Sequence, residues 1–206
     1  MADKKFLSGV YGLDSPQATQ SLYDDWAATY ETEIEENGYA TPGRCAAALA
    51  AAAEDISAPV LDLGCGTGLG GAALRAAGFT MVDGSDLSKQ MLAEAAKRAG
   101  VYCDLIHTEI ADPLPFAPGA YANVMAAGVI SPQHAPAETI DAVLEMLPTG
   151  GCLAFSLNDN AIEDPAFPGK VHQVTASSAA DLVFEEHGPH LPGIGLEATV
   201  YVLRKR

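Results

Sequence analysis

From about residue 58 onward, short continuous apolar runs alternate with segments in which apolar residues recur every three or four positions. The short runs indicate strands, and the longer period indicates helices. Alternation of the two predicts a parallel sheet with helices on both faces, and nearly continuous apolar strands are typical of strands buried on both sides. We expect strands in APVLDLG, FTMVDGSD, VYCDLI, AYANVMAAGVI and CLAFSLN, and helices in GLGGAALRAAG, LSKQMLAEAAKRAG and PAETIDAVLEMLPTGG.

The two ends of the chain depart from this alternation. Near the C-terminus, DLVFEEH and EATVYVLRK are predicted strands separated only by GPHLPGIGL, which is too short for a parallel crossover, so we expect them to be antiparallel. Residues up to about 52 instead predict helices, in SPQATQSLYDDWAATYETEIEENG and TPGRCAAALAAAAED. We interpret residues 1–206 as one α/β domain, with a helical cap over residues 1–52 and a core over residues 58–206.

Composition narrows the class of partner. The 206 residues carry 27 Asp and Glu against 11 Lys and Arg, a formal net charge of −16. Such a chain repels phosphate, so we expect no nucleic acid and no anionic membrane as partner. The four cysteines form no C-x-x-C pair and no zinc spacing, which favours reduced thiols and a cytoplasmic location. No apolar run has the length of a membrane span, and the N-terminus does not have the pattern of a signal peptide.

The glycine-rich stretch VLDLGCGTGLGG, directly after the first predicted strand, indicates a ligand loop. A nucleotide phosphate is excluded because Ala72 and Ala73 follow the last glycine where a Walker loop needs Lys and Ser or Thr. Gly66 to Gly71 matches the dinucleotide pattern G-x-G-x-x-G literally, and an acidic residue follows about 20 residues later, as that pattern requires. Two points oppose it: the turn already opens at Gly64, and the carboxylate of Asp62 would repel a pyrophosphate.

The residues that follow the second and third predicted strands favour a cationic ligand, S-adenosylmethionine (SAM), over a dinucleotide. Asp86 closes the second predicted strand and can accept hydrogen bonds from both ribose hydroxyls. Leu87 and Met91 offer apolar surface to an adenine ring, and Glu109 with the backbone of Ile110 can contact the ring edge. These positions follow the carboxyl ends of neighbouring strands, where open α/β sheets bind ligands.

Four motifs in register, VLDLGCGTG, VDGSDLSKQML, DPLPF and LPTGG, resemble the class I SAM-dependent methyltransferase family over about residues 58–157. YDDWAATYE resembles a segment that caps SAM in small-molecule members of the family. GVISPQHAP and FEEHGPHLPG resemble the methyltransferase-like subgroup of the Williams–Beuren syndrome region. The resemblance implies a Rossmann-like sandwich with a seven-stranded, mostly parallel sheet and an antiparallel last strand.

By position, the resemblance also implies the cofactor contacts. Two departures from the family pattern concern local geometry: Ala122 stands where an Asp is usual, and Thr149 is inserted before the glycine pair. The implied contacts with SAM are Tyr23, Trp26, Tyr30, Asp62, Gly64, Cys65, Gly66, Asp86, Leu87, Met91, Glu109, Ile110, Ala126, Ala127 and Gly128.

Several of these residues also have an ordinary structural interpretation. The aromatic residues of the N-terminal segment are spaced as a core-facing helical stripe would be, Met91 can be plain core, and Glu109 can be a solvated loop carboxylate. His134 follows the fourth predicted strand and can deprotonate an acceptor, although a lone loop histidine is more often structural. His187 and His190 match no standard metal spacing, so we expect no metal.

The predicted activity is in-line transfer of a methyl group from SAM to a small-molecule acceptor, with Tyr30 and His134 as candidate catalytic residues. Methyl transfer from a sulfonium depends mainly on alignment, so it requires no fixed acid–base pair. Two alternatives stay open: a module that binds SAM or S-adenosylhomocysteine without transferring a methyl group, and a nicotinamide-dependent oxidoreductase. The acceptor, the atom methylated and the oligomeric state are not predicted.

Overall fold

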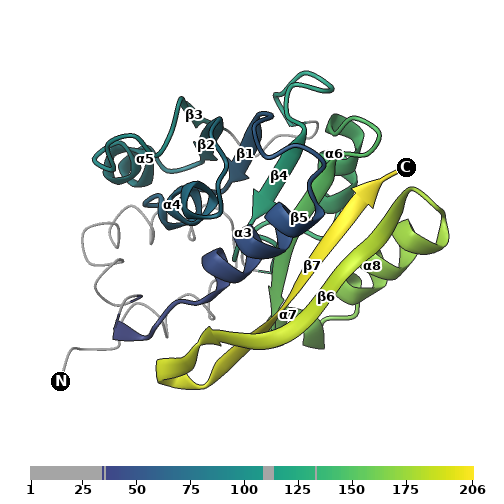
Figure 1. The fold of residues 1–206 in the computed structure, drawn as a ribbon. Helices are drawn as coiled ribbons and strands as arrows, with labels where there is room; N and C mark the ends of the chain where they lie inside the picture. The colour runs from purple at the N-terminus through teal and green to yellow at the C-terminus, as the bar shows by residue number, and fades with distance from the viewer. Residues whose placement is uncertain (1–33, 35, 109–113, 133) are drawn as a thin grey trace.

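The computed structural model of the chain describes residues 34, 36–108, 114–132 and 134–206. Its centre is one seven-stranded sheet in the order β3-β2-β1-β4-β5-β7-β6, with helices packed on both sides (Figure 1). The strands are β1 (Val60–Leu63), β2 (Val82–Asp86), β3 (Leu105–His107), β4 (Asn123–Ala126), β5 (Cys152–Asn158), β6 (Ala180–Leu191) and β7 (Leu196–Lys205). The helices are α3 (Thr41–Ala52), α4 (Leu69–Ala76), α5 (Lys89–Ala95), α6 (Thr139–Met146), α7 (Asp159–Glu163), α8 (Ala166–Ala176) and the short 3₁₀ helix η1 (Pro192–Ile194).

Strand directions confirm the predicted sheet. β1 to β5 pair in parallel, and β7 pairs antiparallel with both β5 and β6. The fold is therefore a mostly parallel α/β sandwich with a reversed last strand, as the sequence predicts.

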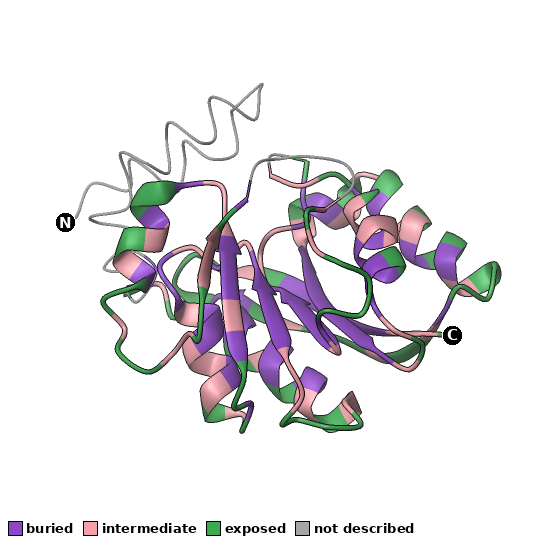
Figure 2. Ribbon diagram, turned by 90° about the horizontal axis from the view of Figure 1, so that it is seen from above, coloured by how far each residue is buried: buried purple, intermediate pink, exposed green. Residues whose placement is uncertain are grey.

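Alternation along the central strands divides the core into two layers. On β5, Leu153 and Phe155 belong to a cluster with α6 and α8, whereas Cys152 and Ala154 belong to a second cluster with α3 and α4. Successive side chains of a strand point to opposite faces, so apolar residues at every position give both helix layers a surface to pack on. Figure 2 shows this as buried strands between helices whose sheet-facing sides are buried.

The strand order reverses between β1 and β4. β1 is flanked by β2 on one side and by β4 on the other. The chain after β1 leads to α4 and the chain after β4 leads to α6, which pack on opposite faces of the sheet. The carboxyl edge at such a reversal is where α/β proteins bind ligands. The glycine-rich loop begins at this edge, directly after β1.

The structure differs from the predicted elements at three strands and two helices. β6 continues to Leu191 and is much longer than DLVFEEH, because the segment expected as a loop pairs with β7 as far as Leu191↔Leu196. β3 is Leu105–His107, so most of VYCDLI precedes it, and β4 ends at Ala126 instead of extending through GVI. α7 and α8 were not predicted; α8 buries only Phe167, Val171 and Val174, and this narrow apolar stripe is interrupted by Pro168 and Gly169.

Of the expected N-terminal helices, the second is confirmed as α3, which packs against α4, β5 and β7. Most of the first lies outside the described residues; of its end, Ile34 and Glu36 are helical, and Asn37 and Gly38 form a turn. The division into a cap over residues 1–52 and a core stays a prediction. Among the described residues, no helix combines the length and apolar character needed to cross a membrane.

Candidate functional site

The glycine-rich loop runs from the end of β1 to the start of α4. Gly64, Gly66 and Gly68 have φ angles of +69°, +53° and +95°, a region that side chains with a Cβ rarely adopt. The backbone N–H groups of Gly64 and Cys65 both donate to the carbonyl of Ser85 in β2, at 2.8 and 2.9 Å. These bonds hold the loop over the end of β2, where Asp86 follows.

The last two glycines of the stretch belong to α4 rather than to the loop. A Cβ on Gly70 would lie 2.6 Å from the carboxylate oxygens of Asp62, and one on Gly71 would lie 2.3 Å from the Tyr102 ring. They are therefore glycines for packing inside the domain. The turn between β1 and α4 is Gly64–Gly68, and this register differs from that of the literal dinucleotide match; its role as the ligand loop stays a prediction.

Asp62 is buried beneath this loop and is 2% exposed. The Tyr102 hydroxyl donates to Asp62 Oδ2 at 2.7 Å and accepts from the backbone N–H of Gly71 at 3.1 Å. Burial raises the pKa of the Asp62 carboxyl to about 7, while the hydrogen bond from Tyr102 opposes the rise and the charge of Asp86 adds to it. Tyr102 thus links β1 to the first turn of α4, a role that the sequence pattern gave no means to predict.

Asp86 stands at the end of β2, across from the loop. Its Oδ2 accepts from the Gly66 N–H at 2.8 Å, and its Oδ1 accepts from the Ser88 N–H at 2.8 Å. Ser88 is the predicted N-cap of α5, and its side chain accepts from the backbone N–H of Met91. Asp86 therefore fastens the glycine loop to the start of α5.

The predicted cofactor residues fit SAM on two observations. A Cβ added to Gly66 would meet no atom of the described residues within 4 Å, so this glycine borders open space among them. Both Asp86 oxygens accept from a backbone N–H, of Gly66 and of Ser88, which holds the carboxylate at the end of β2, where the ribose contact is predicted.

The remaining predicted positions differ in how accessible they are. Leu87 is half-buried next to Asp86, whereas Met91 is 2% exposed and packs as core. Ala126 is fully buried, and the Ala127–Gly128 turn after it is half-buried, with the Gly128 N–H bonded to the Ser156 hydroxyl at 2.9 Å. Cys65 is buried, and burial raises the pKa of its thiol, so it is not a reactive thiolate.

His134 lies in the loop after β4, as expected, and forms a pair with Ser131. The Ser131 hydroxyl and His134 Nδ1 are 2.6 Å apart, and burial lowers the pKa of His134 to about 4. The imidazole is therefore neutral at physiological pH. Tyr23, Trp26, Tyr30, Glu109 and Ile110 lie outside the described residues, and their predicted roles stay predictions.

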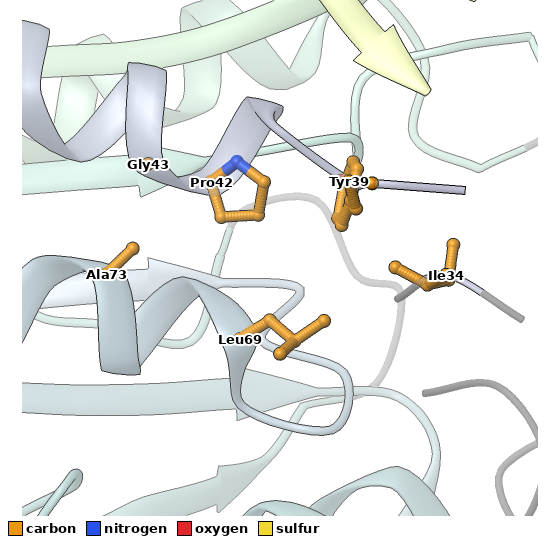
Figure 3. A pocket seen from close by; sticks show the side chains of 7 residues that line it. Ile34, Tyr39, Pro42, Gly43, Leu69 and Ala73 are labelled. Carbon is orange, nitrogen blue, oxygen red and sulfur yellow. The ribbon is translucent and has the colours of Figure 1, made fainter. Parts of the chain in front are cut away.

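A hollow of about 370 Å³ adjoins the loop between the first turns of α3 and α4 (Figure 3). It contains none of the predicted cofactor residues. The hydroxyl of Tyr39, which lines the hollow, lies 3.5 Å from the Ala127 carbonyl. The hollow therefore borders the turn after β4 that is predicted to close the cofactor site. The hollow is lined by Ile34, Gly38, Tyr39, Pro42, Gly43, Leu69 and Ala73.

Comparisons with known proteins agree with this geometry. The family model described as a methyltransferase domain matches residues 60–151, from β1 to the start of β5. Methyltransferase-like protein 27 of Homo sapiens is 34% identical over 158 residues, which are 75% of this chain and 64% of the relative. The chain thus spans less than two thirds of that relative's length.

Two solved structures share the fold at low sequence identity. Burkholderia thailandensis 1,6-didemethyltoxoflavin-N1-methyltransferase, with bound 1,6-didemethyltoxoflavin and S-adenosylhomocysteine, is 16% identical, with a TM-score of 0.64 over 94% of this chain and 91% of that chain. The cyclase SpnF is 17% identical, with a TM-score of 0.59 over 79% of this chain and 80% of that chain.

The fold is shared with solved class I methyltransferase structures, and residues 60–151 match a methyltransferase domain. These similarities agree with the predicted SAM-dependent methyltransferase family and with SAM as the cofactor.

Proposed function

We propose that this chain transfers a methyl group from SAM to a small-molecule acceptor. The observation that carries the proposal is the loop Gly64–Gly68 at the carboxyl edge of the sheet, whose Gly66 N–H is bonded to Asp86 at the end of β2. When bound, SAM supplies an electrophilic methyl group on a sulfonium. In this proposal Asp86 holds the ribose, Gly64 to Gly66 contact the methionine end, and the buried charge of Asp62 favours the nearby ammonium.

Two features support a small acceptor. Helix α7 begins at Asp159, directly after β5, so no recognition domain is inserted there. The charge of −16 disfavours a nucleic-acid acceptor. The Burkholderia thailandensis N1-methyltransferase binds 1,6-didemethyltoxoflavin with this fold, so the fold can accommodate a small acceptor.

His134 is the proposed proton acceptor of the site. Ser131 fixes the orientation of its ring, and the neutral imidazole can take a proton from an acceptor hydroxyl or amine. A pKa of about 4 keeps the imidazole unprotonated at neutral pH and makes it a weak base. Since the rate of methyl transfer depends chiefly on alignment, a weak base is sufficient in this proposal. His134→Asn is expected to lower kcat by a larger factor than that by which it raises KM.

The alternative of a SAM-binding protein without methyl transfer is favoured by one comparison. The cyclase SpnF has the same fold, and a fold alone does not determine the reaction. Calorimetry against SAM, S-adenosylhomocysteine and NAD, followed by a methyl-transfer assay on hydroxyl, amine and thiol acceptors, separates the possibilities. SAM binding with turnover supports the proposal, SAM binding without turnover on any acceptor supports the alternative, and binding of NAD alone contradicts both.

A further inference from the structure

Three potential metal ligands converge at the carboxyl edge of the sheet, outside the glycine-loop site. They are Asp159, which directly follows β5, His187 in β6 and Glu197 in β7. These elements are neighbours, because the sheet order at this side is β5-β7-β6. The sequence gives no motif for them, since His187 and Glu197 lie 28 and 38 residues after Asp159.

Strand register explains why these side chains meet. His187 is paired with Thr199 across β6 and β7, and Glu197 lies two residues before Thr199, on the same face of the sheet. On the other side, Asn158 pairs with Ala198, so Asp159 comes level with Glu197. Strands β6 and β7, and the residue directly after β5, therefore present one ligand each to the same place.

The ligand atoms are already close together. His187 Nε2 lies 3.0 Å from Asp159 Oδ1, and His187 Nδ1 lies 3.8 Å from Glu197 Oε2. One ligand atom from each residue can be chosen so that all three lie within 4.8 Å of one another. The Glu197 backbone N–H donates to Asp159 Oδ2 at 3.2 Å, which fixes the orientation of that carboxylate and leaves Oδ1 directed at the imidazole.

We propose that Asp159, His187 and Glu197 form a binding site for a divalent transition-metal ion. One imidazole nitrogen with two carboxylate oxygens suits Zn²⁺ or Mn²⁺ better than Ca²⁺ or Mg²⁺, which prefer oxygen ligands throughout. The two carboxylates balance the charge of the ion. The side chains are 43%, 50% and 52% exposed, so an ion reaches them from solvent and keeps open coordination positions for water or an oxygen ligand.

The direct test is calorimetric titration of the untagged full-length chain with ZnCl₂ after treatment with a chelator. A Cys103→Ser background removes the exposed thiol, which would itself bind zinc. We expect one zinc ion per chain. His187→Gln and Glu197→Gln are each expected to weaken binding by at least about tenfold, because even the loss of a residue that only supports a metal ligand costs about 10- to 100-fold.

Matched control variants are His172→Gln in α8 and Glu185→Gln in β6, both at exposed positions outside the cluster. They should leave zinc binding unchanged, and circular dichroism should show the same fold for all variants. X-ray absorption of the zinc-bound protein should show nitrogen and oxygen neighbours without sulfur. Absence of binding, binding that His187→Gln does not weaken, or sulfur neighbours would overturn the proposal. SAM binding is measured separately on the same variants, so that failure of the metal site is distinguished from failure of the methyltransferase proposal.

Discussion

Asp86 connects two turns with one side chain, since its oxygens accept from Gly66 in the ligand loop and from Ser88 at the start of α5. Removing the carboxylate therefore removes the predicted ribose contacts and also releases the loop. We expect Asp86→Ala to weaken SAM binding by about tenfold or more, since a hydrogen bond to a charged group contributes about 1.5–3 kcal/mol. Calorimetry measures the change. Glu145→Ala, which removes an exposed carboxylate from α6, is the control, and unchanged affinity in Asp86→Ala would refute the ribose role.

Tyr102 contacts Asp62, which is buried beneath the same loop. Its hydroxyl bridges Asp62 and the Gly71 N–H, and this bridge lowers the pKa of the Asp62 carboxyl against the effect of burial. Tyr102→Phe keeps the ring and removes the bridge, so we expect Asp62 to ionise at a higher pH and SAM binding at neutral pH to weaken. Titrations across pH should show the binding curve displaced toward alkaline pH. A uniform loss of affinity with no displacement would mean that Tyr102 serves only to pack the core.

At the scale of elements, the glycines of α4 and α8 have opposite structural roles. A Cβ on Gly71 would overlap the Tyr102 ring, whereas one on Gly169 in α8 meets nothing within 4 Å. We expect Gly71→Ala to destabilise the fold by about 1–3 kcal/mol through overpacking. Gly169→Ala should stabilise it by about 0.4–1 kcal/mol, because alanine restricts the unfolded chain. Denaturant unfolding of both variants checks the pair, and equal effects would contradict the packing assigned to Gly71.

The elements that sequence predicts well are those whose burial pattern is simple. β1 and β5 are short, mostly apolar runs that are almost wholly buried, and the Gly64–Gly68 loop follows from its glycines. The end of β6 was missed because it includes Gly188 and Pro189, so a paired strand has the composition of a loop. The contacts of Asp62 with Tyr102, and of His187 with Asp159, join residues 40 and 28 positions apart, and no local pattern encodes such contacts.

At the scale of the whole molecule, the chain has a net charge of −16, and one of its carboxyls, that of Asp62, has a pKa raised by burial. The pKa of Asp62 in the folded protein is about 7, above the ordinary value of 3.8. A raised pKa means that the folded state favours the protonated form. The contribution of Asp62 to stability is therefore fully present below about pH 4 and is lost as the pH rises through about 7. Thermal unfolding of Asp62→Asn, which cannot ionise, should lose this part of the pH dependence.

A bound ligand with an ammonium and a sulfonium reverses that preference, because positive charge near Asp62 favours the ionised carboxylate. SAM binding at pH 6 must then release a proton from Asp62, whereas at pH 8 the carboxyl is already ionised and no proton is released from it. We therefore expect affinity for SAM to rise from pH 6 to pH 8 and then level off. Calorimetry in buffers of different ionisation enthalpy counts the released proton directly. Proton release at pH 6 that persists in Asp62→Asn would assign the effect to another group and would contradict the placement of the ammonium beside Asp62.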